Sequence, residues 1–96
     1  MKILITNDDG IEAGGIIKLA ENAKKFGEVT VIAPATQSSA MSHHITLGVD
    51  LEYKGFDFPV EGVEAYALAG TPADCIRAAF LGLLPKDRLP DVVFSG

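Results

Sequence analysis

The chain has one cysteine, no tryptophan, and no long hydrophobic or basic run. The lone Cys75 excludes a disulfide framework and a cysteine-based zinc site. Its 8 basic residues against 13 acidic ones give a net charge of −5, which argues against a module that binds a nucleic acid duplex. The absence of a signal peptide and of a bilayer-spanning apolar segment predicts a cytoplasmic protein with no membrane partner.

What is present fits one globular domain, since hydrophobic residues make up 48% and charged residues 22% of the 96 residues. Ile3–Ile5 and Glu28–Ala33 are short apolar runs typical of buried parallel strands. Between them, apolar residues at helical spacing predict an amphipathic helix that stops at Gly27. Its predicted apolar face comprises Ile16, Leu19, Ala20, Ala23 and Phe26.

The middle of the chain predicts further strands. Apolar and polar residues alternate from Ile45 to Tyr53, which predicts one half-buried strand that is antiparallel or at a sheet edge. The segment from Lys54 to Gly62 is rich in turn-forming residues. Val63–Ala69 is another predicted strand.

A second helix and a last strand follow. Thr71 is placed to act as the N-cap, Pro72 suits the first helical position, and Asp74 can reach back to the cap. Pro85 ends this helix, and Asp91–Phe94 predicts a final strand. The predicted apolar face of the helix comprises Ile76, Ala79, Phe80 and Leu83.

These elements predict the α/β class with a mostly parallel sheet. The first strand, the first helix and the second strand form a βαβ unit, for which a right-handed crossover is expected. Ser95 and Gly96 directly follow the last predicted strand, where a loop and a covering helix are expected. We therefore expect residues 1–96 to be one incomplete domain, truncated after that strand.

The first predicted strand ends in Asn7-Asp8-Asp9-Gly10. Open α/β sheets bind their ligands at the carboxyl ends of strands. Two adjacent carboxylates at such a place predict a bound cation, which would neutralise their like charges. The alternative is that Asp8 and Asp9 are turn residues that accept hydrogen bonds from nearby backbone donors.

Three segments together resemble the SurE (stationary-phase survival protein E) family. They are Asn7–Ile11, Ala33-Pro34 with the serine-rich loop that leads into His43–Leu47, and Gly70–Cys75. The resemblance implies a Rossmann-like three-layer sandwich, of which residues 1–96 form the amino-terminal part. It also implies a metal-dependent 5'-nucleotidase, a phosphatase that acts on nucleoside monophosphates and in some members on polyphosphate. The family forms homo-oligomers, so a homodimer or homotetramer is expected.

The resemblance places one divalent cation per subunit on Asp8, Asp9 and Ser39, with an asparagine ligand that would lie beyond Gly96. Ser38 offers a neighbouring hydroxyl, and the family spacing selects Ser39. A donor set made only of oxygen suits Mg²⁺ or Mn²⁺. Asp8 and Asp9 are then the catalytic residues, because the ion that they hold polarises a phosphoryl oxygen and lowers the pKa of its water.

Asn7 and His43 are the candidate substrate-binding residues. Asn7 can orient a carboxylate or contact phosphate, and it can equally be an ordinary turn residue. His43 can donate a proton to the leaving alkoxide or bind phosphate as a cation. His44 offers the same chemistry, and either histidine can be a solvated loop residue.

Three further residues with reactive or hydrogen-bonding side chains are expected to have structural roles. Thr71 and Asp74 are expected to be helix caps, although the free amides of that helix start can also face an anion. Cys75 is expected to be a small buried hydrophobic residue rather than a nucleophile.

Three functions compete for this sequence. The first is a divalent-metal phosphomonoesterase whose substrate is a nucleoside monophosphate or another phosphate ester. The second is a receiver domain, but Asp50 lies within a predicted strand and no lysine follows the last strand, so the required acceptor and lysine are absent. The third is a non-catalytic metal- or nucleotide-binding fragment that lacks the rest of the active site.

Overall fold

The computed structural model describes residues 1–36, 45–47 and 51–95, which form one mixed sheet with the strand order β3-β4-β5-β2-β1-β6. Strands β5, β2, β1 and β6 pair parallel with one another, while β4 pairs antiparallel with both β3 and β5. The strands are β1 (Lys2–Thr6), β2 (Glu28–Pro34), β3 (Ile45–Leu47), β4 (Leu51–Phe56), β5 (Glu64–Leu68) and β6 (Val92–Ser95).

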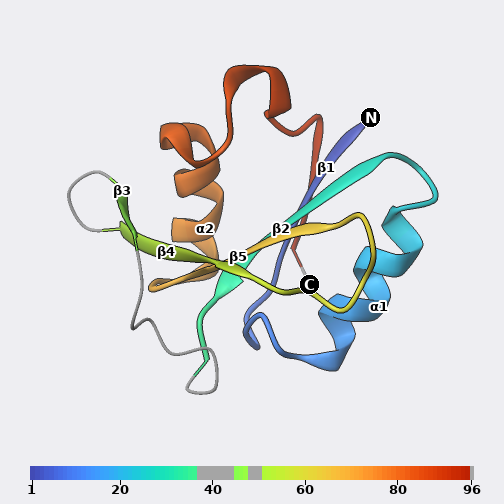
Figure 1. Ribbon diagram of the computed structural model, residues 1–96, viewed down its shortest axis with the longest axis horizontal. Helices are drawn as coiled ribbons and strands as arrows, with labels where there is room; N and C mark the ends of the chain where they lie inside the picture. Colours follow the sequence, from blue (N-terminus) through green and yellow to red (C-terminus); the bar gives the residue numbers. More distant parts are fainter. Residues whose placement is uncertain (37–44, 48–50, 96) are drawn as a thin grey trace.

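Helices cover both faces of this sheet, which confirms the predicted three-layer α/β fold. Helix α1 (Gly14–Ala23) packs on one face, and α2 (Pro72–Ala78) packs on the other (Figure 1). Two short helical segments, η1 (Ala79–Leu83) and η2 (Lys86–Arg88), connect α2 to β6. Neither helix within the described part of the chain has the length and apolar character needed to span a bilayer.

Strand β1 lies between β2 and β6 in the sheet, and it is buried on both faces because α1 and α2 pack on opposite sides of it. Ile3 and Ile5 pack in the core beneath α1, whereas Leu4 packs in the core beneath α2. A continuous apolar run is what a parallel strand covered on both faces requires. The prediction that the first, second and last strands run parallel is confirmed by the registers of β1 with β2 and β6.

The predicted single strand from Ile45 to Tyr53 is wrong, because the structure has a hairpin there. Ile45 pairs with Tyr53 and Leu47 with Leu51, so the chain reverses direction between β3 and β4. Residues that lie opposite each other in an antiparallel pair share a face, so the alternation runs unbroken through both strands. Strand β4 also extends to Phe56, into the segment that was expected to be turns.

Two aromatic residues that were placed on apolar helix faces are instead exposed. Helix α1 ends at Ala23, and the turn that follows leaves Phe26 72% exposed. Helix α2 continues after Ala78 as the wider π-helical turn η1, which changes the angular spacing of side chains. Phe80 is 56% exposed because the buried side of the helix is centred on Cys75, Ala78 and Ala79, and the next residue points away from it. The buried side of α2 and η1 consists of Cys75, Ala78, Ala79 and Leu83.

The predicted start of α2 is confirmed. The Asp74 amide donates to Thr71 Oγ1 at 3.2 Å, and the Thr71 amide donates to Asp74 Oδ2 at 3.0 Å. This is a reciprocal capping box with Pro72 in the first turn. The hydrogen bonds from Thr71 hold the pKa of the Asp74 carboxyl below its ordinary value of 3.8.

Replacement of Asp74 by alanine should lower the Tm at neutral pH, since the hydrogen bonds that the Thr71 amide and hydroxyl donate to the Asp74 carboxylate are lost. The folded pKa is lower than the unfolded one, so the unfolded chain binds the extra proton first as the pH falls. The contribution of Asp74 is therefore present above about pH 4 and is lost at lower pH. Thermal unfolding at pH 7 and near pH 2.5 should show a difference in Tm that shrinks in acid. The exposed Asp57→Ala control should show no such pattern, and a pH-independent difference for Asp74→Ala would contradict the capping role.

Cys75 belongs to the core rather than to a reactive site. Its side chain is 0% exposed and packs with Leu4, Ile32 and Leu68 between α2 and the sheet. Burial raises the pKa of the thiol to about 11, and the nearby Thr6 hydroxyl lowers it by less. The reactive thiolate is therefore scarce at neutral pH.

Thiol reagents should accordingly fail to modify Cys75 in the folded protein. At pH 8 a pKa of about 11 leaves roughly one thiolate per thousand molecules, and the buried sulfur is also inaccessible. Labelling with a chromogenic disulfide should be slow in buffer and fast in guanidinium chloride. Rapid labelling of the folded chain at its free-thiol rate would show that this residue is accessible.

Candidate metal site at the carboxyl edge of the sheet

The candidate site is the turn that leaves β1. The parallel pairing of β1 with β2 and β6 brings the carboxyl ends of these strands to one edge of the sheet. Asp8 and Asp9 lie in the turn at this edge, and both are exposed. The structure thus places the two predicted carboxylates where open α/β sheets bind their ligands.

Asn7 closes this turn from the inside. It is 4% exposed, and its Nδ2 donates to the Gly10 carbonyl at 2.9 Å. Its Oδ1 accepts a hydrogen bond from the Gly10 amide at 3.2 Å. The predicted role of Asn7 in contacting phosphate stays a prediction, while its side-chain amide serves the turn in this structure.

The turn from Asn7 to Gly10, here called the aspartate turn, is also attached to the end of β2. The Ile11 amide donates to the Pro34 carbonyl at 2.9 Å, and the Ile11 side chain is 0% exposed in the core beneath α1. The turn is therefore fixed to β1 at one end and to β2 and the core at the other. Asp8 and Asp9 project from a backbone that is held on both sides.

The donor chemistry of this turn fits a hard divalent cation. Carboxylate oxygens are the ligands that Mg²⁺ and Mn²⁺ prefer, and the two carboxylates are adjacent, exposed and of the same charge. Among the described residues, no group of three or more histidine, cysteine, aspartate or glutamate side chains gathers in one place. A site built on Asp8 and Asp9 would therefore need other oxygen donors, including water.

A cavity opens directly beside Asp9. It has a volume of about 140 Å³ and lies between the aspartate turn and the first half of α1. Helix α1 has no side-chain cap at Ala13 and no acidic residue in its first turn. The first turn of this helix therefore adds no negative charge to the cavity. The sequence analysis did not identify this helix face as part of a site. The cavity lining comprises Asn7, Asp9, Ala13, Gly15, Ile16 and Leu19.

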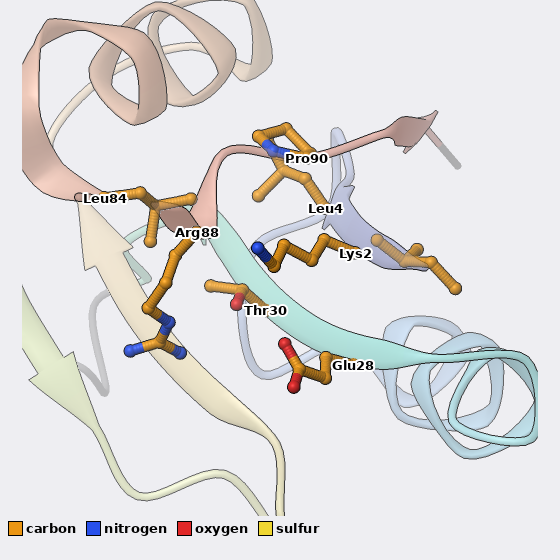
Figure 2. Close-up of a pocket in the computed structure, with 8 residues that line it drawn as sticks. Lys2, Leu4, Glu28, Thr30, Leu84, Arg88 and Pro90 are labelled. Atoms are coloured by element: carbon orange, nitrogen blue, oxygen red, sulfur yellow. The ribbon is translucent and has the colours of Figure 1, made fainter. Parts of the chain in front are cut away.

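A second hollow lies at the opposite edge of the sheet, between the start of β1 and η2 (Figure 2). Charged side chains surround it, and Arg88 forms an ion pair with Glu64 at 2.6 Å. Its volume of about 10 Å³ has room for about one water molecule. It is therefore too small for a substrate.

The remaining predicted site residues are not placed by this structure. Ser39, His43 and the alternatives Ser38 and His44 lie outside the described residues. Thr36 is the last described residue before them, and the sequence analysis did not single it out. Thr36 lies against Gly10, since a Cβ added at Gly10 would be 2.5 Å from Thr36 Cγ2. This contact depends on how β2 ends beside β1, for which a single sequence carries no local signal.

Comparisons with known proteins agree with this architecture. A family model described as Survival protein SurE matches residues 3–96. A protein of Alkaliphilus metalliredigens named 5'-nucleotidase SurE is 52% identical over 96 residues, and one of Chlorobium limicola with the same name is 48% identical over 94 residues. The chain spans 37% and 35% of the lengths of these relatives, and 100% and 98% of the chain is matched.

A solved structure gives the same result for the fold. The crystal structure of the SurE protein from Aquifex aeolicus matches with a TM-score of 0.66 and 33% identity. The match covers 98% of this chain and 36% of the Aquifex chain. With the family model covering residues 3–96, these findings show that the chain belongs to the SurE family.

Proposed function

We propose that this chain carries the metal-binding half of the active site of a 5'-nucleotidase. The proposed reaction is the hydrolysis of nucleoside 5'-monophosphates by a divalent-metal-dependent phosphomonoesterase, with polyphosphate as a further substrate class. The main supporting observation is the pair of exposed carboxylates, Asp8 and Asp9, beside a cavity at the carboxyl edge of the sheet. Relatives that match the chain along its length carry the name 5'-nucleotidase SurE.

Asp8 and Asp9 would hold one Mg²⁺ or Mn²⁺ ion, with Ser39 as the third ligand from this chain. Such an ion would polarise a phosphoryl oxygen and would lower the pKa of its bound water, so that a hydroxide nucleophile is available at neutral pH. The two aspartates supply the negative charge that retains the cation, and Asn7 maintains the turn from which they project. His43 is proposed to bind phosphate or to protonate the leaving alkoxide.

The cavity beside Asp9 supports the proposal that the substrate binds at this edge of the sheet. Its volume of about 140 Å³ is comparable to a cavity that holds a six-membered ring. It is therefore large enough for part of a phosphate ester but not for a whole nucleotide. We propose that the phosphate ester lies over the aspartate turn. The rest of the nucleotide would then contact parts of the protein other than the described residues.

The same proposal includes an oligomeric state, a substrate class and a cellular location. We propose that the protein acts as a homodimer or homotetramer on a nucleoside monophosphate or another phosphate ester, in the cytoplasm. The alternative is a non-catalytic metal- or nucleotide-binding fragment. It is favoured by one observation, namely that Asp8 and Asp9 have no third acidic, histidine or cysteine side chain gathered with them among the described residues.

Replacement of Asp9 by asparagine tests the metal site. The substitution removes one of two charges that would hold the cation and should weaken Mn²⁺ binding by about 10-fold or more. Calorimetric titration of the full-length protein with Mn²⁺ measures the affinity, and phosphate release from a nucleoside monophosphate measures turnover. Asp57→Asn removes the same charge from an exposed turn after β4 and should change neither quantity.

The outcomes of this experiment separate the two functions. Weaker Mn²⁺ binding together with lost turnover supports the nucleotidase. Weaker binding in a protein that never hydrolyses the monophosphate supports the non-catalytic alternative. Unchanged Mn²⁺ affinity in the Asp9→Asn variant would refute the assignment of the metal to this turn.

A further inference from the structure

The aspartate turn is locked by contacts that do not involve the aspartates themselves. Asn7 is buried, and its side-chain amide both donates to and accepts from the backbone of Gly10. An amide side chain has one donor group and one acceptor, so it satisfies both polar groups of the same residue. Asp8 and Asp9 therefore lie in a backbone loop that this pair of hydrogen bonds closes.

Gly10 fits against the chain that leaves β2. Its φ is 102°, a value that residues with a Cβ rarely adopt. A Cβ at this position would lie 2.5 Å from Thr36 Cγ2 and 3.5 Å from the Pro34 carbonyl oxygen. The first distance is far shorter than a van der Waals contact, so an added methyl group would force the Thr36 side chain or one of the two segments to shift.

Backbone pairing holds the same two segments together. The Ile11 amide donates to the Pro34 carbonyl, and the buried Ile11 side chain anchors this end of the turn in the core. Gly10 and Thr36 are thus in contact because the residues beside them are pinned. A change at Gly10 would be transmitted to the aspartates on one side and to the segment after β2 on the other.

We propose that Asn7, Gly10 and Thr36 are positioning residues that set the direction of Asp8 and Asp9 and couple this turn to the segment leaving β2. In this role they act through the two aspartates, whose backbone they hold in place. The exposed carboxylates depend on this unit because metal affinity requires ligand oxygens within a narrow range of positions. The inference rests on the proposed metal site and adds the residues that shape it.

The test is the Gly10→Ala variant of the full-length protein, with Mn²⁺ affinity and the Tm of the metal-free protein as the readouts. The added Cβ should reduce Mn²⁺ affinity by about 10-fold, the size typical of losing a residue that orients metal ligands. Gly62→Ala is the matched control, because Gly62 also has a positive φ of 80° but meets only the Lys24 side chain, at 3.5 Å. It should lower the Tm and leave the Mn²⁺ affinity unchanged. Gly14→Ala, where nothing lies within 4 Å of an added Cβ, should leave the affinity unchanged as well.

A rescue experiment tests the contact with Thr36 itself. Thr36→Ser removes the Cγ2 methyl group and keeps the hydroxyl. In the Gly10→Ala background it should restore part of the lost Mn²⁺ affinity, and the positive φ should prevent full recovery. Asn7→Ala provides a second variant if Gly10→Ala does not fold, and it should also weaken Mn²⁺ binding by about 10-fold.

Each outcome decides a different claim. If Asp9→Asn weakens Mn²⁺ binding but Gly10→Ala and Asn7→Ala do not, the positioning role is refuted and the metal site stands. If Thr36→Ser restores nothing to Gly10→Ala, the coupling to the segment after β2 is refuted. If Asp9→Asn itself leaves the affinity unchanged, the proposed metal site fails first.

Discussion

The structure depends on one constraint, which is the burial of β1 on both faces between β2 and β6. Leu4 and Ile5 are fully buried and contribute to the cores under opposite helices, so the strand cannot carry a polar residue along its middle. Polar groups are therefore displaced to the strand's end, where the chain emerges beside the ends of β2 and β6. The same parallel pairing that stabilises the sheet thus creates a polar edge with Asp8 and Asp9 on it.

This edge combines rigid support with exposed chemistry. Asn7 and Ile11 face inward and fix the turn to its neighbours, whereas Asp8 and Asp9 face solvent. Burial of Asn7 costs little because both polar groups of its amide are hydrogen bonded to Gly10. We assign the metal site to this edge because two adjacent exposed carboxylates project from a backbone that is fixed on both sides.

The sequence predicted the elements whose signal is local. The apolar run of β1 and the capping box of α2 were correct because each depends on neighbouring residues. The β3–β4 hairpin was missed because alternation looks the same in one strand and in two paired strands. Phe80 was misplaced because the helix buries the side that carries Cys75 and Ala78 rather than the side that carries Ile76 and Phe80. The position of Asp8 and Asp9 followed from where β1 ends, but the contact of Gly10 with Thr36 joins segments distant in sequence and left no local pattern.

The central claim is that a divalent cation binds at the turn after β1, and paramagnetic broadening of amide NMR signals tests it most directly. Substoichiometric Mn²⁺ added to the ¹⁵N-labelled protein broadens the signals of amides close to the ion. The account predicts that signals from residues 6–11 and from Ala35 and Thr36 broaden first. Signals from Lys2 and Glu28, at the opposite edge of the sheet, should stay sharp. First broadening at that opposite edge, or equal broadening at all acidic surface residues, would contradict the account.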